Sequence, residues 1–160
     1  QYAGLIPDFG IFAKRPAKKM LDNAIKKGAS PAILEAVAHA CEAGENVERL
    51  MGIVKGMGGG DAESAVAMSW ARNRFSDPEW LRDFAPYILH CHGKFYDMDE
   101  QCNETGIDYE SPLAVLKDIG FNGYICSEFE GQRLYAGEEE PDEIGQVRRH
   151  HVMLRRLLGE

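Results

Sequence analysis

The residues best suited to chemistry lie in one short stretch, Ile88 to Tyr96, in which polar side chains occupy every second position. Successive side chains of an extended strand point to opposite faces, so His90, His92 and Lys94 are expected to share one face. Two imidazoles and an ammonium group do not build a core, and such a face needs a metal ion, an anion, a polar ligand or water. A His-x-His pair on a strand therefore indicates a metal site, and the alternative is a polar strand face in solvent.

Two carboxylates occupy comparable places on other predicted strands. Asp8 follows a buried strand predicted for Tyr2–Ile6, and Glu128 lies in a strand predicted for Tyr124–Glu130. Ligands of parallel α/β folds bind at the carboxyl ends of strands, so we expect Asp8, His92 and Glu128 to converge. One imidazole and two carboxylates suit a divalent cation such as Mn²⁺, Mg²⁺, Co²⁺ or Zn²⁺. Taken by itself, Asp8 fits a turn residue better.

The predicted strands alternate with helical segments. The order is strand, helices, strand, helix, strand, helix, which predicts an α/β fold with a parallel sheet. A long helical insertion, about residues 16–86, separates the first strand from the second, and Asp77-Pro78 begins its last helix. The final helix begins near Glu143, and its apolar spacing predicts that His151 packs in the core while His150 is exposed.

Composition sets the class of protein. The chain has 160 residues, which fits one domain, 1–160, and its net charge of −8 argues against general nucleic-acid binding. No apolar run approaches the roughly 20 residues that span a bilayer, so we expect no membrane partner. The four cysteines show no C-x-x-C spacing. Free thiols in a reducing compartment are the simplest account of them, which predicts a cytoplasmic protein.

Three motifs together resemble a known superfamily. Pro7-Asp8-Phe9-Gly10, the stretch from His90 to Tyr96, and Tyr124 to Gly131 are similar to the sugar phosphate isomerase/epimerase superfamily, the xylose-isomerase-like TIM barrels. The resemblance is strongest to the members that include the large subunit of bacterial C-glycoside deglycosidases. It covers nearly the whole chain, but only about three βα units, strands six to eight, of a (β/α)8 barrel. The implied fold is therefore the carboxyl-terminal portion of a TIM barrel.

The resemblance also implies an activity and a set of roles. Asp8, His92 and Glu128 match three of the four metal ligands of the family, and the first glutamate would lie upstream. The implied reaction is proton transfer beside the carbonyl of a sugar or sugar phosphate, as in an isomerase or epimerase, through a metal-stabilised enediolate. Glu128 is the expected acid/base. The ketose epimerases carry a histidine and an arginine where this chain has Ile11 and Met98, which counts against that activity.

The remaining candidates would contact the substrate. His90 and Lys94 are expected to bind its oxygens, Glu130 to support the site, and Phe9 to line an apolar aglycone or sugar face, together with Phe12 and Tyr96. One alternative activity is C-glycoside deglycosidase, a lyase-type cleavage of an oxidised glycoside. Another is no catalysis at all, in an interaction module or a degenerate barrel that has lost its metal.

The predicted sheet is too small to close by itself. Three strands leave unpaired edges, whereas the superfamily barrel needs eight. We therefore expect that residues precede Gln1 in a longer protein, or that the sheet edge pairs with another chain, for example in a homo-oligomer. Alone, these residues would lack the fourth metal ligand and should be inactive as an isomerase.

Overall fold

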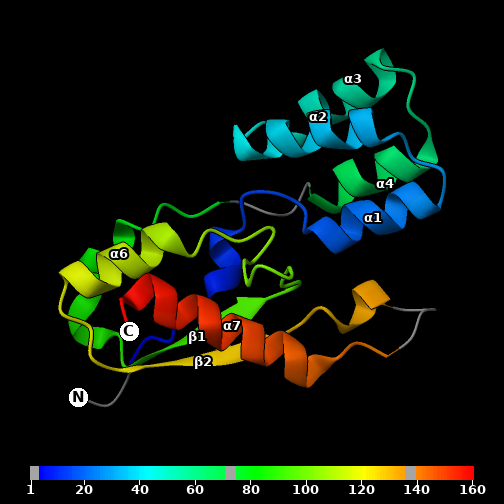
Figure 1. The fold of residues 1–160 in the computed structure, drawn as a ribbon. Coiled ribbons are helices and arrows are strands. Elements are labelled where there is room, and N and C mark those ends of the chain that lie inside the picture. Colours follow the sequence, from blue (N-terminus) through cyan, green and yellow to red (C-terminus); the bar gives the residue numbers. More distant parts are fainter. Residues whose placement is uncertain (1–3, 71–74, 136–139) are drawn as a thin grey trace.

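The computed structural model of the protein describes residues 4–70, 75–135 and 140–160. Figure 1 shows two groups of elements. The first, called the helical group below, consists of α1 (Lys18–Lys26), α2 (Pro31–Glu42), α3 (Val47–Gly56) and α4 (Asp61–Trp70). The second is built around two strands with α6 (Glu110–Asp118) and α7 (Glu143–Leu158) packed beside them.

The two strands are β1 (His90–Phe95) and β2 (Tyr124–Phe129), and they run parallel as predicted. Their register places Lys94 opposite Glu128. The amino-terminal segment runs parallel to the other edge of β1, but it makes only isolated bridges, which join Leu5 to Ile88 and Asp8 to His92. Within the described residues the sheet therefore has two strands, with β1 in the middle of three aligned segments.

The prediction of a buried strand over Tyr2–Ile6 needs correction. Residues 1–3 lie outside the described part of the chain, and Leu5 and Ile6 are 39 % and 51 % exposed. The segment borders β1 along one edge, but in the described part of the chain Leu5 and Ile6 remain exposed, so its apolar sequence does not produce burial.

The faces of β1 alternate as its sequence predicts. Cys91 and Phe95 are fully buried, whereas His90, His92 and Lys94 are partly exposed on the opposite face. The buried face packs against α7, whose His150 ring stacks on Phe95 with the ring centres 4.3 Å apart. The polar side chains are thus held on a strand whose other face is anchored in the core.

The prediction for the two histidines of α7 is wrong. His150 is fully buried and His151 is exposed. Two overlapping seven-residue patterns could form the buried face of this helix. The more apolar pattern contains Ile144, but Ile144 is 66 % exposed. The other pattern includes Gln146 and His150, which enter the core because both side chains form hydrogen bonds there.

The helical group has its own apolar interior. Val37, Leu50 and Val54 of α2 and α3 are almost completely buried. The Glu63 carboxylate of α4 accepts hydrogen bonds from the backbone N–H groups of Ser30 and Gly60, which fixes the start of α2 against the start of α4. None of the helices within the described residues is long and apolar enough to cross a bilayer.

The rest of the predicted helical insertion behaves differently. The helix expected from Asp77-Pro78 is only the short α5 (Trp80–Asp83), followed by the 3-10 turn η2 (Ala85–Tyr87). Pro86 lacks the N–H that a continuing helix needs. Because α5 packs against α6, residues 75–87 belong with the strands rather than with the helical group.

Candidate metal centre

The structure brings Asp8, His92 and Glu128 together. One ligand atom from each residue lies within 4.8 Å of the ligand atoms of the other two. Asp8 caps the 3-10 turn η1 (Phe9–Phe12), with its Oδ1 accepting from the N–H of Gly10 at 2.7 Å. His92 donates its backbone N–H to the carbonyl of Pro7 at 2.9 Å, which aligns the two segments at this point. The predicted convergence of the three side chains is therefore present.

Lys94 lies among the same carboxylates. Its Nζ is 2.6 Å from Asp8 Oδ2, 3.4 Å from Glu130 Oε1 and 3.8 Å from Glu128 Oε2. Partial burial lowers the pKa of Lys94, but the hydrogen bond with Asp8 and the three nearby carboxylates outweigh that effect, so its pKa is raised overall. The ammonium group thus stays charged and acts as the counter-ion of the acidic cluster.

Two atoms in the cluster are buried without a hydrogen bond to any residue that the structure describes: Glu128 Oε2 and His90 Nε2. Glu128 Oε2 lies 3.4 Å from His92 Nδ1, and the rings of His90 and His92 are 5.1 Å apart. A buried carboxylate oxygen without a donor is costly unless a cation or a ligand contacts it. Two carboxylates and an imidazole with such an unsatisfied oxygen fit the ligand set of a divalent metal ion.

The other predicted site residues divide into two groups. His90, Lys94 and Glu130 lie at the cluster, as their positions on the strands predict. Phe9 does not, since it is 0 % exposed and packs against Phe12 and Tyr109 in the core. Its burial excludes Phe9 from contact with a substrate in this structure, so that prediction is corrected, and the same holds for Phe12.

A buried hydrogen-bonded chain behind the cluster was not predicted. The Tyr109 hydroxyl donates to the Lys94 carbonyl at 2.7 Å. Since its proton is used there, the hydroxyl oxygen accepts from His150 Nε2 at 2.8 Å. His150 Nδ1 then carries no proton and accepts from the Ser127 hydroxyl at 2.8 Å. Burial, and to a smaller extent the charge of His151, lowers the pKa of His150 to about 3. This series of hydrogen bonds keeps the His150 imidazole neutral and holds the backbone of Lys94 in place. The sequence feature that could have indicated these buried hydrogen bonds is the helical spacing of two polar residues, Gln146 and His150, on α7.

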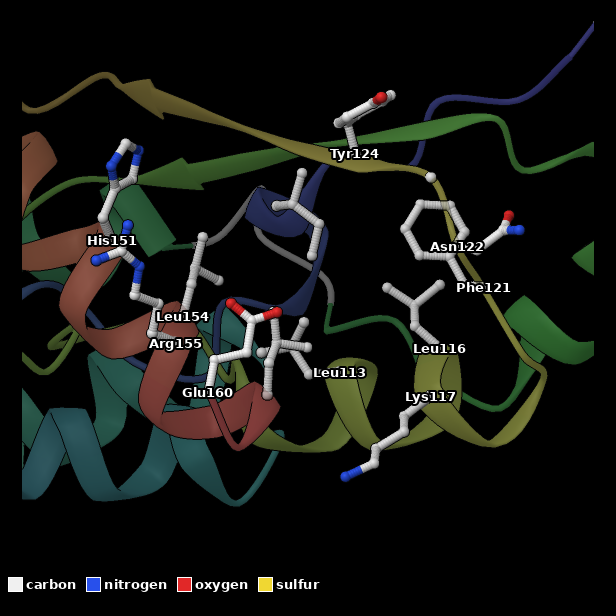
Figure 2. A pocket seen from close by; sticks show the side chains of 13 residues that line it. Leu113, Leu116, Lys117, Phe121, Asn122, Tyr124, His151, Leu154, Arg155 and Glu160 are labelled. Carbon is white, nitrogen blue, oxygen red and sulfur yellow. The ribbon is translucent and has the colours of Figure 1, made fainter.

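A cavity that the structure describes lies away from this cluster. It has a volume of 490 Å³ and lies between α6, α7 and the start of β2. Figure 2 shows leucines of both helices beneath the strands, with His151, Arg155 and Lys117 around them. Tyr124 marks the amino end of β2, whereas ligand sites in parallel α/β folds form at the carboxyl ends. We therefore do not assign the chemistry to this cavity.

The chain is similar to named deglycosidase subunits. It is 29 % identical over 174 aligned positions to the 3'-dehydrocarminate deglycosidase alpha subunit of a Microbacterium species, which covers 99 % of this chain and 49 % of the relative. It is 40 % identical over 82 residues to a C-glycoside deglycosidase alpha subunit of Arthrobacter globiformis, covering 51 % of this chain and 23 % of the relative. A third relative, from Microbacterium trichothecenolyticum, is 42 % identical over 53 residues, or 33 % of this chain and 14 % of the relative.

The chain matches only part of each relative. The chain spans about half the length of the first of these relatives and about a quarter of the second. No protein-family model matches it. By their names, these relatives are subunits of deglycosidases. The names agree with the deglycosidase alternative of the sequence analysis rather than with an isomerase or epimerase.

Proposed function

We propose that the chain forms the metal-binding part of a C-glycoside deglycosidase alpha subunit. The observation that carries the proposal is the convergence of Asp8, His92 and Glu128 in a chain that aligns over 99 % of its length with a subunit of that name. In this proposal the two aligned strands and the segment before them are the last βα units of a TIM barrel, and the helical group is an insertion between two of them.

Each residue of the cluster has a place in this proposal. Asp8, His92 and Glu128 hold the metal ion, which when bound supplies a Lewis acid that polarises the carbonyl of an oxidised sugar. Lys94 and His90 bind the oxygens of the sugar, and Glu130 keeps Lys94 in position through their 3.4 Å ion pair. The buried chain through Tyr109 holds the backbone that carries Lys94.

The reaction needs one proton removed and one returned. A proton leaves the carbon next to the sugar carbonyl, the C–C bond to the aglycone breaks at the following carbon, and the released aglycone carbon takes up a proton. The products are an unsaturated keto sugar and the free aglycone, with no net oxidation. We propose that Glu128 takes part in these transfers as the acid/base, because its Oε2 is otherwise without a hydrogen-bond donor among the described residues.

The test uses the protein as its gene encodes it, purified with any subunit that accompanies it. The substrate is an aryl C-glucoside whose 3-hydroxyl has been oxidised to a ketone, and the readouts are aglycone release and bound metal. We expect stoichiometric divalent metal, and loss of both metal and activity in Asp8→Asn and His92→Asn. Glu45→Gln, an exposed acidic residue of the helical group, serves as the control. Full activity in a metal-free His92→Asn protein would refute the proposal.

The isomerase activity implied by the superfamily is tested in the same protein. Glu128→Gln is expected to abolish exchange of solvent deuterium into the substrate while the far-ultraviolet circular dichroism stays unchanged. Aldose–ketose interconversion without aglycone release would favour the isomerase over the deglycosidase.

A further inference from the structure

A second cavity lies beside the metal centre, between the helical group and the carboxyl ends of the strands. Its volume is 260 Å³. One wall comes from Met20 of α1, Trp70 of α4 and the segment before α1, and the other from Tyr96 and the segment after β2. The residues of the two segments are Ala13, Arg15, Pro16 and Ala17 in the first, and Glu130, Arg133 and Leu134 in the second. The cavity thus joins two parts of the chain that are far apart in sequence.

The cavity and the metal centre share one side chain. Glu130 lines the cavity, and its Oε1 is 3.4 Å from the Nζ of Lys94, which is itself 2.6 Å from Asp8. Tyr96 directly follows β1, and it lines the cavity together with Glu130. A molecule that reaches the metal ligands with one end can therefore reach this cavity with the other.

The lining favours a flat, apolar group. Pro16, Met20, Trp70, Tyr96 and Leu134 present rings and hydrocarbon surface, which suit stacking against an aromatic ligand. The volume is slightly below the roughly 300–1,000 Å³ of pockets that enclose a whole drug-sized ligand, so it suits one part of a larger substrate.

The charges at the cavity favour an acidic group on that ligand. Arg15 is engaged by Glu35 and Glu42 of α2. Arg133 is exposed and makes no ion pair with the residues that the structure describes, so its guanidinium is available to a phenolate or a carboxylate.

The wall that carries Arg133 is held in place by contacts with α1. The side-chain amide of Asn23 donates a hydrogen bond to the carbonyl of Leu134, and Lys19 lies 4.4 Å from the ring centre of Tyr135. These contacts fix η3 (Gln132–Tyr135) against the helical group, so the cavity is a formed feature of the fold.

We infer that this cavity binds the planar aromatic aglycone of the substrate and that Arg133 pairs with an acidic group on it. The inference rests on the proposed function, because it assumes a substrate made of a sugar and an aglycone. It assigns specificity for the aglycone to the helical group and to η3, while the sugar is held by the strand residues.

The experiment measures binding without turnover, by calorimetry of the protein as its gene encodes it. The probes are 2-naphthoate and the uncharged 2-naphthol. Leu134→Trp fills the cavity and should weaken the binding of both probes more than tenfold. Arg133→Gln should weaken 2-naphthoate about two- to fivefold, as expected for one exposed ion pair, and leave 2-naphthol unchanged. Arg148→Gln, an exposed arginine of α7, is the matched control and should bind both probes like the wild type.

The outcomes separate this inference from the proposed function. Asp8→Asn is expected to lose aglycone release but keep its affinity for 2-naphthoate. Absence of saturable binding to the wild type, or wild-type affinity for 2-naphthoate in Arg133→Gln and Leu134→Trp alike, would overturn the assignment of the cavity. If Leu134→Trp does not fold, the exposed Arg133→Gln decides by itself. Probe binding at the cavity without aglycone release from any oxidised C-glycoside would instead overturn the proposed function.

Discussion

Lowering the pH should destabilise this fold through His150. The side chain is fully buried, and burial keeps the pKa of its imidazole at about 3, whereas an exposed histidine has a pKa of about 6.5. The folded state therefore binds no proton at His150 between pH 7.5 and pH 5, while the unfolded state does. Since the folded pKa is the lower one, the stabilising contribution is complete above pH 6.5 and is lost as the pH falls toward 3.

The size of the effect follows from the two pKa values. Integrating the difference in bound protons gives a loss of about 2 kcal/mol of unfolding free energy between pH 7.5 and pH 5. The mechanism is visible in the buried chain: a protonated Nδ1 would be a donor, and it could no longer accept from Ser127, 2.8 Å away. Phe95, stacked on the ring, supplies only a cation–π contact and no counter-ion for the charge.

The assay compares urea unfolding of the wild type and of His150→Gln at pH 7.5 and at pH 5. All other titrating groups are the same in both proteins, so the wild type should lose about 2 kcal/mol more than the variant on acidification. NMR titration of the His150 ring gives the folded pKa directly. A midpoint near pH 6, or equal losses in the two proteins, would refute the reasoning.

Three further predictions concern the site and the sheet. Lys94→Met removes the counter-ion beside Asp8, so Mn²⁺ should bind the metal-free protein about tenfold more tightly or better, measured by calorimetry; weaker binding would contradict the assignment. Tyr109→Phe removes the hydroxyl that bonds the Lys94 carbonyl and His150 Nε2, and it should lower the unfolding free energy by about 1–3 kcal/mol in urea melts; a neutral effect would show that these buried hydrogen bonds are not stabilising. The 160-residue chain should sediment as a dimer or larger species at micromolar concentration, since the outer edge of β2 has no partner strand among the described residues; a folded monomer would show that the edge needs no cover.

The sequence was sufficient to predict which side chains share the polar face of β1 and which three residues are candidate metal ligands. A period of two is unambiguous when polar and apolar residues alternate as strictly as they do from Leu89 to Phe95, so His92 could be assigned to the same face as Lys94. Asp8 and Glu128 followed from the rule that parallel strands gather their carboxyl ends at one edge. Convergence of the three side chains is what the structure then adds.

The errors arose where burial depends on distant partners. The register of α7 could not be read from apolar residues, because Gln146 and His150 enter the core only when Met98, Tyr109 and Ser127 are there to bond with them. Phe9 follows a candidate ligand in sequence, but the 3-10 turn after Asp8 directs its ring into the core beside Tyr109. Neither contact leaves a local signal in the chain.

The position of Lys94 has a consequence for how the protein is made. Three carboxylates held this close would repel one another in a newly synthesised chain, and many small metal sites fold only once the ion is bound. Here an ammonium group already lies 2.6 Å from Asp8 and within 4 Å of both glutamates. The chain can therefore complete its folding before the proposed metal ion binds. Under the proposed function, a chelator should then remove the activity without unfolding the protein.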